Sequence, residues 1–276
     1  MSLNSINTNI GAMVALQSLN RTSEELAATQ KRISTGYRVA DARDDGAAFA
    51  VAERVRGDIA ATTSANEQMG GVKGLADVTR ASLENVSKSL VKLKELTVKL
   101  ADGSITAEQR SQYQEQAKQV VNNIKAFIEG ASYNGTNLIN TGGADAKVVI
   151  DAAGGSFTLS AFDMIASVYD VISDVNTWDS TQASQALTAG GAVSSAITAT
   201  LTRLNTFGSY SRFLDTQINF NKSKIDAMEA GMGALVDADL ARESAKLQAL
   251  QIRQQLGAQA LGIANQAPQV LLSLFR

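Results

Sequence analysis

The sequence predicts a mainly α-helical protein, an elongated antiparallel helical bundle or coiled coil with paired terminal helices and a small β-hairpin insert. Two observations support this fold class. Apolar residues recur at steps of three and four over long stretches, which is typical of packed helices. The 276 residues also include one proline and only 5% aromatic residues, although 45% are hydrophobic. Such a composition favours long helices over sheets.

The first helix is predicted over about residues 9–33, before the turn at Gly36. Met1 to Asn20 carries no charged side chain. The predicted seam with 4-3 spacing comprises Ala12, Leu16, Leu19, Ser23, Leu26, Gln30 and Ile33. A second apolar line contains Leu3, Ile6, Ile10 and Met13. Two apolar lines on one helix predict neighbours on two sides. The charged loop that follows, around residues 37–48, fits a turn held by local side-chain hydrogen bonds.

The apolar patterns in the middle of the chain predict a helical bundle. A helix from about residue 47 to 66 is expected to loosen at Gly70, Gly71 and Gly74, before a heptad pattern over residues 72–100. Thr106 and Gln109 have the spacing of a capping box for the next helix. Residues 147–151 and 156–160 alternate and predict a β-hairpin. Residues 161–190 are expected to be irregular and exposed, and a seam over residues 193–235 predicts a long helix.

The last helix, from about residue 236, also carries two apolar stripes, and Gly231 with Gly233 predicts a joint before it. Leu256 and Leu261 represent the two stripes and lie about 140° apart around a helix axis. The first stripe contains Leu240, Leu247, Leu250, Leu261, Ala264, Leu271 and Phe275. The second contains Ala245, Ala249, Ile252, Leu256, Ile263, Ala267, Val270 and Leu274. One stripe is enough for one partner, so two stripes predict packing on two sides.

These patterns predict two domains. Residues 1–44 and 236–276 form a discontinuous terminal-helix domain, and residues 45–235 form the bundle domain with its hairpin near 147–160. Uncharged, apolar chain ends are unusual, because termini normally are polar and fray. We therefore expect the two termini to pair with each other and then with other subunits. The residues predicted to pack between subunits are Leu3, Ile6, Ile10, Leu16, Leu19, Leu26, Leu250, Ile252, Leu256, Leu261, Ile263, Val270, Leu271, Leu274 and Phe275.

The composition argues against enzyme chemistry. Histidine and cysteine are both absent, so the usual nucleophile–base pairs and nitrogen or sulfur metal sites cannot be built. Asp237 and Asp239 precede a helix, where capping explains them better than metal binding. We therefore expect no catalytic, cofactor-binding or metal-binding residues. A net charge of −2 gives no basis for nucleic-acid binding. No membrane-spanning segment and no cleaved signal peptide are expected.

Several segments together resemble the bacterial flagellin family. Near the start these are Ile6 to Asn9, Arg32 to Gly36 and Ala42 to Ala48, and the turn Tyr133 to Thr136 is similar to the family's aromatic-Asn-Gly turn. At the other end, Ala264 to Gln269 followed by Leu271 to Arg276 resembles the family's C-terminal signature. The resemblance covers about residues 1–140 and 193–276.

The resemblance implies a structural subunit that self-assembles into the flagellar filament for motility, in a short form without extra outer domains. It implies export through the flagellar type III channel and an extracellular location in the filament. The implied partners are further copies of the chain, hook-associated junction and cap proteins, and an export chaperone that binds the C-terminal helix. Neither nucleic acid nor a membrane is implied as a partner.

The segment Leu90 to Leu96 resembles the one through which many flagellins engage a Toll-like receptor. Lys92 stands where the family usually has arginine, and Gln116 stands where the facing helix usually has an acid. Since lysine cannot form the bidentate fork of arginine, weaker receptor activation is expected. Leu90, Leu93 and Leu96 are also expected to be packing residues.

Two other functions stay open from the sequence. A hook-associated or junction protein of the same apparatus shares the terminal motifs, but the short middle and the conforming C-terminal signature favour the filament subunit. A membrane-active amphipathic helical protein is disfavoured, because both termini contain few lysine and arginine residues.

Overall fold

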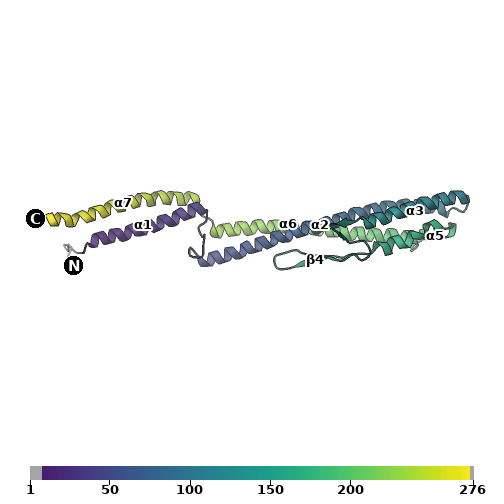
Figure 1. The fold of residues 1–276 in the computed structure, drawn as a ribbon, viewed down its shortest axis with the longest axis horizontal. Coiled ribbons are helices and arrows are strands. Elements are labelled where there is room, and N and C mark those ends of the chain that lie inside the picture. Colours follow the sequence, from purple (N-terminus) through teal and green to yellow (C-terminus); the bar gives the residue numbers. More distant parts are fainter. Residues whose placement is uncertain (1–7, 274–276) are drawn as a thin grey trace. The chain divides into compact units, whose positions relative to one another are not determined.

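The computed structural model describes residues 8–273 and the side chains up to residue 266. The chain divides into two compact units, residues 1–57 with 227–276, and residues 58–226. We call these the terminal unit and the bundle unit. Two long helices, α2 (Gly46–Ala101) and α6 (Ala192–Val236), contribute residues to both units (Figure 1). Long helices dominate the structure, as the sequence predicts.

The terminal unit is built on helices α1 (Ile10–Thr35) and α7 (Leu240–Ser273), which lie side by side (Figure 1). The Asn9 side chain caps α1 by accepting a hydrogen bond from the Ala12 backbone N–H. Helix α1 ends at Gly36, whose φ of 75° is left-handed, a conformation that glycine adopts without steric cost. The predicted N-terminal helix and its turn are confirmed within one or two residues.

The bundle unit has one continuous apolar core, to which α2, α6 and α3 (Ala107–Glu129) contribute. The heptad predicted along α2 is confirmed: its members from Ala76 to Leu100 are buried, and Val72 is half-buried. The capping box of Thr106 and Gln109 at the start of α3 is present. Along α6 the predicted seam is buried or half-buried up to Met232, and only its last member, Leu235, is exposed.

The predicted loosening at the glycines of α2 is wrong, and the joint predicted before the last helix lies at residues 237–239 rather than at the glycines of α6. Helix α2 continues through Gly70, Gly71 and Gly74, and α6 continues through Gly231 and Gly233 to Val236. Each glycine costs a helix about 1 kcal/mol, but burial of apolar residues on the same turns outweighs this cost. Gly74 also makes room for a neighbour, since a Cβ there would lie 3.0 Å from the Tyr133 ring.

Two short antiparallel strand pairs belong to the bundle unit. Strands β1 (Ser132–Tyr133) and β2 (Thr136–Asn137) flank a turn at Asn134 and Gly135, which have φ values of 48° and 79°. Strands β3 (Ala146–Val149) and β4 (Ser156–Leu159) form the predicted hairpin, with Val148 opposite Phe157. Phe157 packs on Phe213 of α6 with ring centroids 4.4 Å apart, so the hairpin is attached to the bundle.

Residues 161–190 were expected to be irregular and exposed, and this expectation is wrong. They form η1 (Ile165–Tyr169), α4 (Asp170–Ile172), η2 (Ser173–Thr177) and α5 (Ser180–Leu187). Residues at near-helical spacing enter the core: Met164, Val168, Ile172, Val175, Trp178, Ala183 and Ala186. The abundance of Ser, Thr and Asp masks this spacing, because these residues lie on the opposite faces and at caps.

We predict that α6 tolerates loss of side-chain volume only outside its core face. Leu214→Ala should lower the free energy of unfolding by about 2–5 kcal/mol, since it leaves a cavity where the side chain is 0% exposed. Leu201→Ala, at 49% exposure on the same helix, should cost less than about 1 kcal/mol. Thermal or urea melts of the monomers measure both values, and equal losses would contradict this assignment of faces.

Candidate assembly surface

The inner face of α7 packs on α1 with regular spacing. The least exposed residues of α7 step by four and three and comprise Glu243, Leu247, Leu250, Gln254, Gly257, Leu261 and Ala264. Leu250 is only 2% exposed. At Gly257 the helices approach closely, because a Cβ there would lie 3.2 Å from a Leu19 methyl group. The first predicted stripe of α7 is thus largely used within the chain.

Polar contacts at both ends of the pair fix the register of the two antiparallel helices. The Asn9 side-chain amide donates to the Ala264 carbonyl at 2.8 Å. Near the other end, the Arg32 guanidinium lies 3.3 Å from Glu243 Oε1. Since these partners are more than two hundred residues apart in sequence, they hold the two ends of the chain together.

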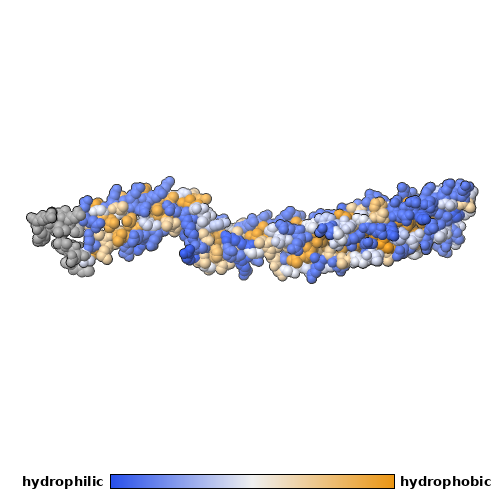
Figure 2. All heavy atoms as spheres, viewed as in Figure 1, coloured by the Kyte–Doolittle hydropathy of each residue, from blue (hydrophilic) through white to orange (hydrophobic). Residues whose placement is uncertain are grey.

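The outer faces of α1 and α7 expose a series of large apolar side chains. On α7 the exposed fractions are 58% for Ile252, 58% for Leu256 and 70% for Ile263. Ile10, Met13, Val14 and Leu16 are exposed on α1, and Figure 2 shows apolar surface over this pair of helices. We call Ile252, Leu256 and Ile263 the outer stripe. Contiguous apolar surface of this kind marks an interaction site.

The predicted packing residues divide between these two faces. Ile10, Leu16, Ile252, Leu256 and Ile263 are exposed. Leu19, Leu26 and Leu261 are half-buried in the seam, and Leu250 is buried there. Leu3, Ile6, Leu274 and Phe275, and the side chains of Val270 and Leu271, lie outside the described residues.

The seam of α1 differs from the predicted one at two positions. Ala15 and Thr29 face α7 in place of Leu16 and Gln30, which are exposed. A straight α-helix drifts by about 20° per heptad relative to a 3.5-residue repeat. Either of two adjacent residues can therefore occupy a seam position, and here the smaller ones do, which leaves Leu16 for the outer face.

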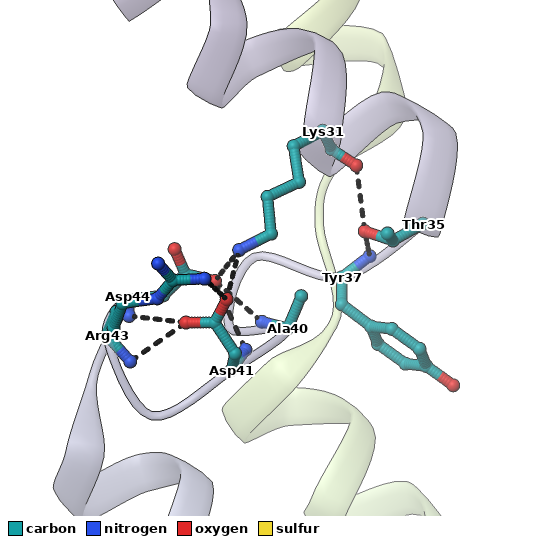
Figure 3. Close-up of polar contacts among 7 residues, drawn as sticks. All are labelled: Lys31, Thr35, Tyr37, Ala40, Asp41, Arg43 and Asp44. Atoms are coloured by element: carbon teal, nitrogen blue, oxygen red, sulfur yellow. Dashed lines mark hydrogen bonds and ion pairs between the residues drawn. The ribbon is translucent and has the colours of Figure 1, made fainter. Parts of the chain in front are cut away.

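The loop after α1 is held by one lysine. Lys31 Nζ donates to Asp41 Oδ2 and to Asp44 Oδ2, both at 2.8 Å (Figure 3). Asp44 Oδ2 also accepts from the Ala40 N–H at 3.0 Å, and Asp41 Oδ1 accepts from the Arg43 N–H at 2.8 Å. The pKa of Asp44 is lowered to about 2, mainly by the hydrogen bond from Lys31 and next by the bond from the Ala40 N–H. The predicted turn held by side-chain hydrogen bonds is confirmed.

The same loop attaches to the end of α6 within the terminal unit. The Arg38 and Val39 N–H groups donate to the Val236 carbonyl at 2.7 and 3.2 Å, and the Ala238 N–H donates to the Gly36 carbonyl at 2.9 Å. Val39 and Val236 bury their side chains with Ala52. Sequence reasoning missed this contact, although Val39 in an otherwise polar loop and Val236 at the end of α6 were a detectable signal.

The residues of the possible receptor segment lie in two environments. Leu90 and Leu96 are 0% and 8% exposed in the bundle core, which confirms their expected packing role. Lys92 and Gln116 are exposed. Weaker receptor activation stays a prediction.

Clusters of potential metal ligands and membrane-spanning helices are two features that the described part of the chain lacks. Residues 8–273 contain no group of three or more His, Cys, Asp or Glu side chains placed to hold a metal ion. Over the same range, no helix combines the length and the apolar character needed to cross a bilayer. Asp239 caps α7, since its Oδ1 accepts from the Ala241 and Arg242 N–H groups at 3.1 Å.

Paired terminal helices with exposed apolar outer faces define a helical protein built for association. Comparisons with known proteins then give the family. The family model of the bacterial flagellin N-terminal helical region matches residues 6–142, and that of the C-terminal helical region matches residues 191–275. The chain is 36% identical to flagellin FljK of Caulobacter vibrioides over 100% of both chains. It is 34% identical to a flagellin of Brucella melitensis over 99% of both.

Two solved structures share the fold. A crystal structure of Bacillus cereus flagellin aligns with a TM-score of 0.52 and 22% identity, over 56% of this chain and 88% of that one. A putative flagellar hook-associated protein from Vibrio parahaemolyticus aligns with a TM-score of 0.58 and 15% identity, over 70% and 100%. The chain belongs to the bacterial flagellin family, and it is a structural subunit of the flagellar filament.

We predict that acid releases the loop held by Lys31. The folded-state pKa of Asp44 is below its ordinary value of 3.8. The network therefore contributes its full stabilisation above pH 3.8, and this contribution is lost as the pH falls through about 2. Carboxyl NMR titration of the native chain should give a pKa of about 2 for Asp44. It should rise towards the ordinary value in Lys31→Met, and an unchanged pKa would contradict this account.

Proposed function

We propose that the terminal unit forms the filament core and that the outer stripe makes its contacts between subunits. The observation that carries this proposal is the division of α7 into two faces. One face is occupied by α1, and the other leaves Ile252, Leu256 and Ile263 more than half exposed. The exposed apolar residues of α1, such as Ile10 and Leu16, extend the available surface.

The energetics support assembly through these faces. Burying one large aliphatic side chain contributes about 1.5–3 kcal/mol, so a few such residues at each contact offset part of the entropy lost on association. A contact between unlike faces of identical subunits generates a helical filament when the rotation between neighbours does not close a ring. The net charge of −2 opposes such close packing only weakly.

The proposal extends to the route and the partners of the chain. We propose export through the flagellar type III channel and an extracellular location in the filament. The proposed partners besides other copies are hook-associated junction proteins, cap proteins and an export chaperone at α7. The C-terminal signature, which lies in the matched region 191–275, supports these assignments. The role is structural, and we assign no catalytic function.

The experiment compares aspartate substitutions on the two faces of α7. Leu256→Asp should leave the melting curve of the monomer unchanged, because the side chain is 58% exposed. It should abolish seeded polymerisation, because the filament would bury an unpaired charge. Leu250→Asp should instead separate α1 from α7 and reduce the helical circular dichroism of the monomer, since Leu250 is 2% exposed.

Gln251→Asp is the matched control, because it adds the same charge at an exposed position about 100° around the helix from the outer stripe. Sedimentation after seeding measures the polymer formed by each variant. Normal polymerisation of Leu256→Asp would refute the proposed role of the outer stripe.

A further inference from the structure

The bundle unit carries a basic surface on α2 with apolar residues at its centre. Val91 and Val98 are 53% and 55% exposed, and Lys88, Lys92 and Lys94 are exposed around them. Among the described residues none of these lysines has a carboxylate within the 4.0 Å of an ion pair. Exposed Glu95 lies on the same turns, but lysines outnumber it. We call this surface the lysine face.

The same unit carries an acidic counterpart. Asp170 and Asp174 are exposed one helical turn apart, with Val171 at 42% exposure beside them. Between Lys147 and Arg203 the sequence has no lysine or arginine. The nearby Lys125 is already engaged, with its Nζ 5.1 Å from the Tyr169 ring centroid and 3.8 Å from Glu129. We call Asp170, Val171 and Asp174 the aspartate face.

Other acids of this segment have local structural roles, which sets these two apart. Asp151 and Asp163 accept backbone hydrogen bonds from their own turns, and Asp179 caps α5. In the described part of the chain, the carboxylates of Asp170 and Asp174 make no hydrogen bond and no ion pair. Only their backbone carbonyls accept hydrogen bonds, from the Ser173 and Thr177 hydroxyls. Their charges are therefore available to a partner.

We infer that the lysine face of one subunit docks on the aspartate face of another copy in the filament. The two faces have opposite charge and matching valines, and no ion pair joins them within one chain. A contact between two different faces of identical subunits is the kind that propagates along a filament. This inference rests on one part of the proposed function, namely that copies of the chain polymerise, and it does not depend on the outer stripe.

The chemistry favours specificity over strength. Each exposed lysine–carboxylate pair contributes little on its own, while juxtaposed like charges are strongly unfavourable. The contact therefore sets the register between neighbours and discriminates against other subunits. The aspartate face lies in residues 143–190, outside both family-model matches, whereas the lysine face lies within the N-terminal match.

A charge-swap experiment tests the pairing. The variants are Lys88→Glu with Lys92→Glu, Asp170→Lys with Asp174→Lys, and all four changes combined. Each two-site variant should raise the monomer concentration left after seeded polymerisation by about tenfold or more, because like charges then face each other. The combined variant restores opposite charges and should polymerise like the original chain. Melting curves should be unchanged, since all four positions are exposed.

Lys118→Glu with Lys222→Glu is the matched control, because both lysines are exposed elsewhere on the bundle unit. It should polymerise normally at about 0.01 M ionic strength, where charge effects are largest. At about 1 M, where the Debye length is about 3 Å, the two-site variants should approach the original chain. Normal polymerisation of either two-site variant at low salt would overturn the inference, and so would failure of the combined variant to recover.

Carbodiimide treatment of intact filaments gives an independent readout. It should join Lys88 or Lys92 to Asp170 or Asp174 in peptides from two isotopically distinct subunits. Crosslinks found only within one subunit would overturn the inference. Failure here leaves the proposed role of the outer stripe standing, because that role is tested by Leu256→Asp in the terminal unit.

Discussion

The constraint on which the terminal unit depends is that α7 is apolar on two sides, while α1 covers only one of them. One face follows a regular four-three repeat and holds α1, with Leu250 buried and Gly257 allowing close approach. The opposite face carries large aliphatic side chains that the chain itself leaves exposed. A helix with a single stripe would either pair with α1 or assemble. Two stripes allow both, so under the proposed function the pairing of the chain ends and the polymerisation of the subunit use different residues.

The loop between α1 and α2 is held mainly by polar contacts. It connects a helix pair with an exposed apolar face to helices that continue into the bundle unit. Its conformation is determined by hydrogen bonds from Lys31 and from backbone N–H groups rather than by a large apolar core. Exposed ion pairs are weak individually, but here several donors converge on two carboxylates. The result is a defined turn that needs few apolar side chains of its own.

Much of the fold could be predicted from the sequence, because heptad spacing is a long-range, redundant signal. The seams of α2 and α6, the capping box at Thr106 and the hairpin at β3 and β4 all follow from local patterns. The errors have identifiable causes. Glycines in α2 and α6 were given their intrinsic helix penalty, yet burial on neighbouring turns overrides it. Residues 161–190 contain core positions such as Met164 and Ile172, but interspersed Ser, Thr and Asp obscured their spacing.

The candidate site was predictable to a different degree. The sequence identified two apolar stripes on α7, but it could not assign each stripe to a partner, since both are apolar and follow helical spacing. The structure makes that assignment through exposure, and it moves Leu16 from the seam of α1 to the outer face because Ala15 fits opposite α7. The possible receptor segment shows the same ambiguity at the level of single residues. Leu90 and Leu96 resemble a binding motif and are core residues, whereas Lys92 on the same helix is exposed. A helical motif therefore specifies which residues are apolar and which are charged, and only the packing around the helix decides which of them can reach another molecule.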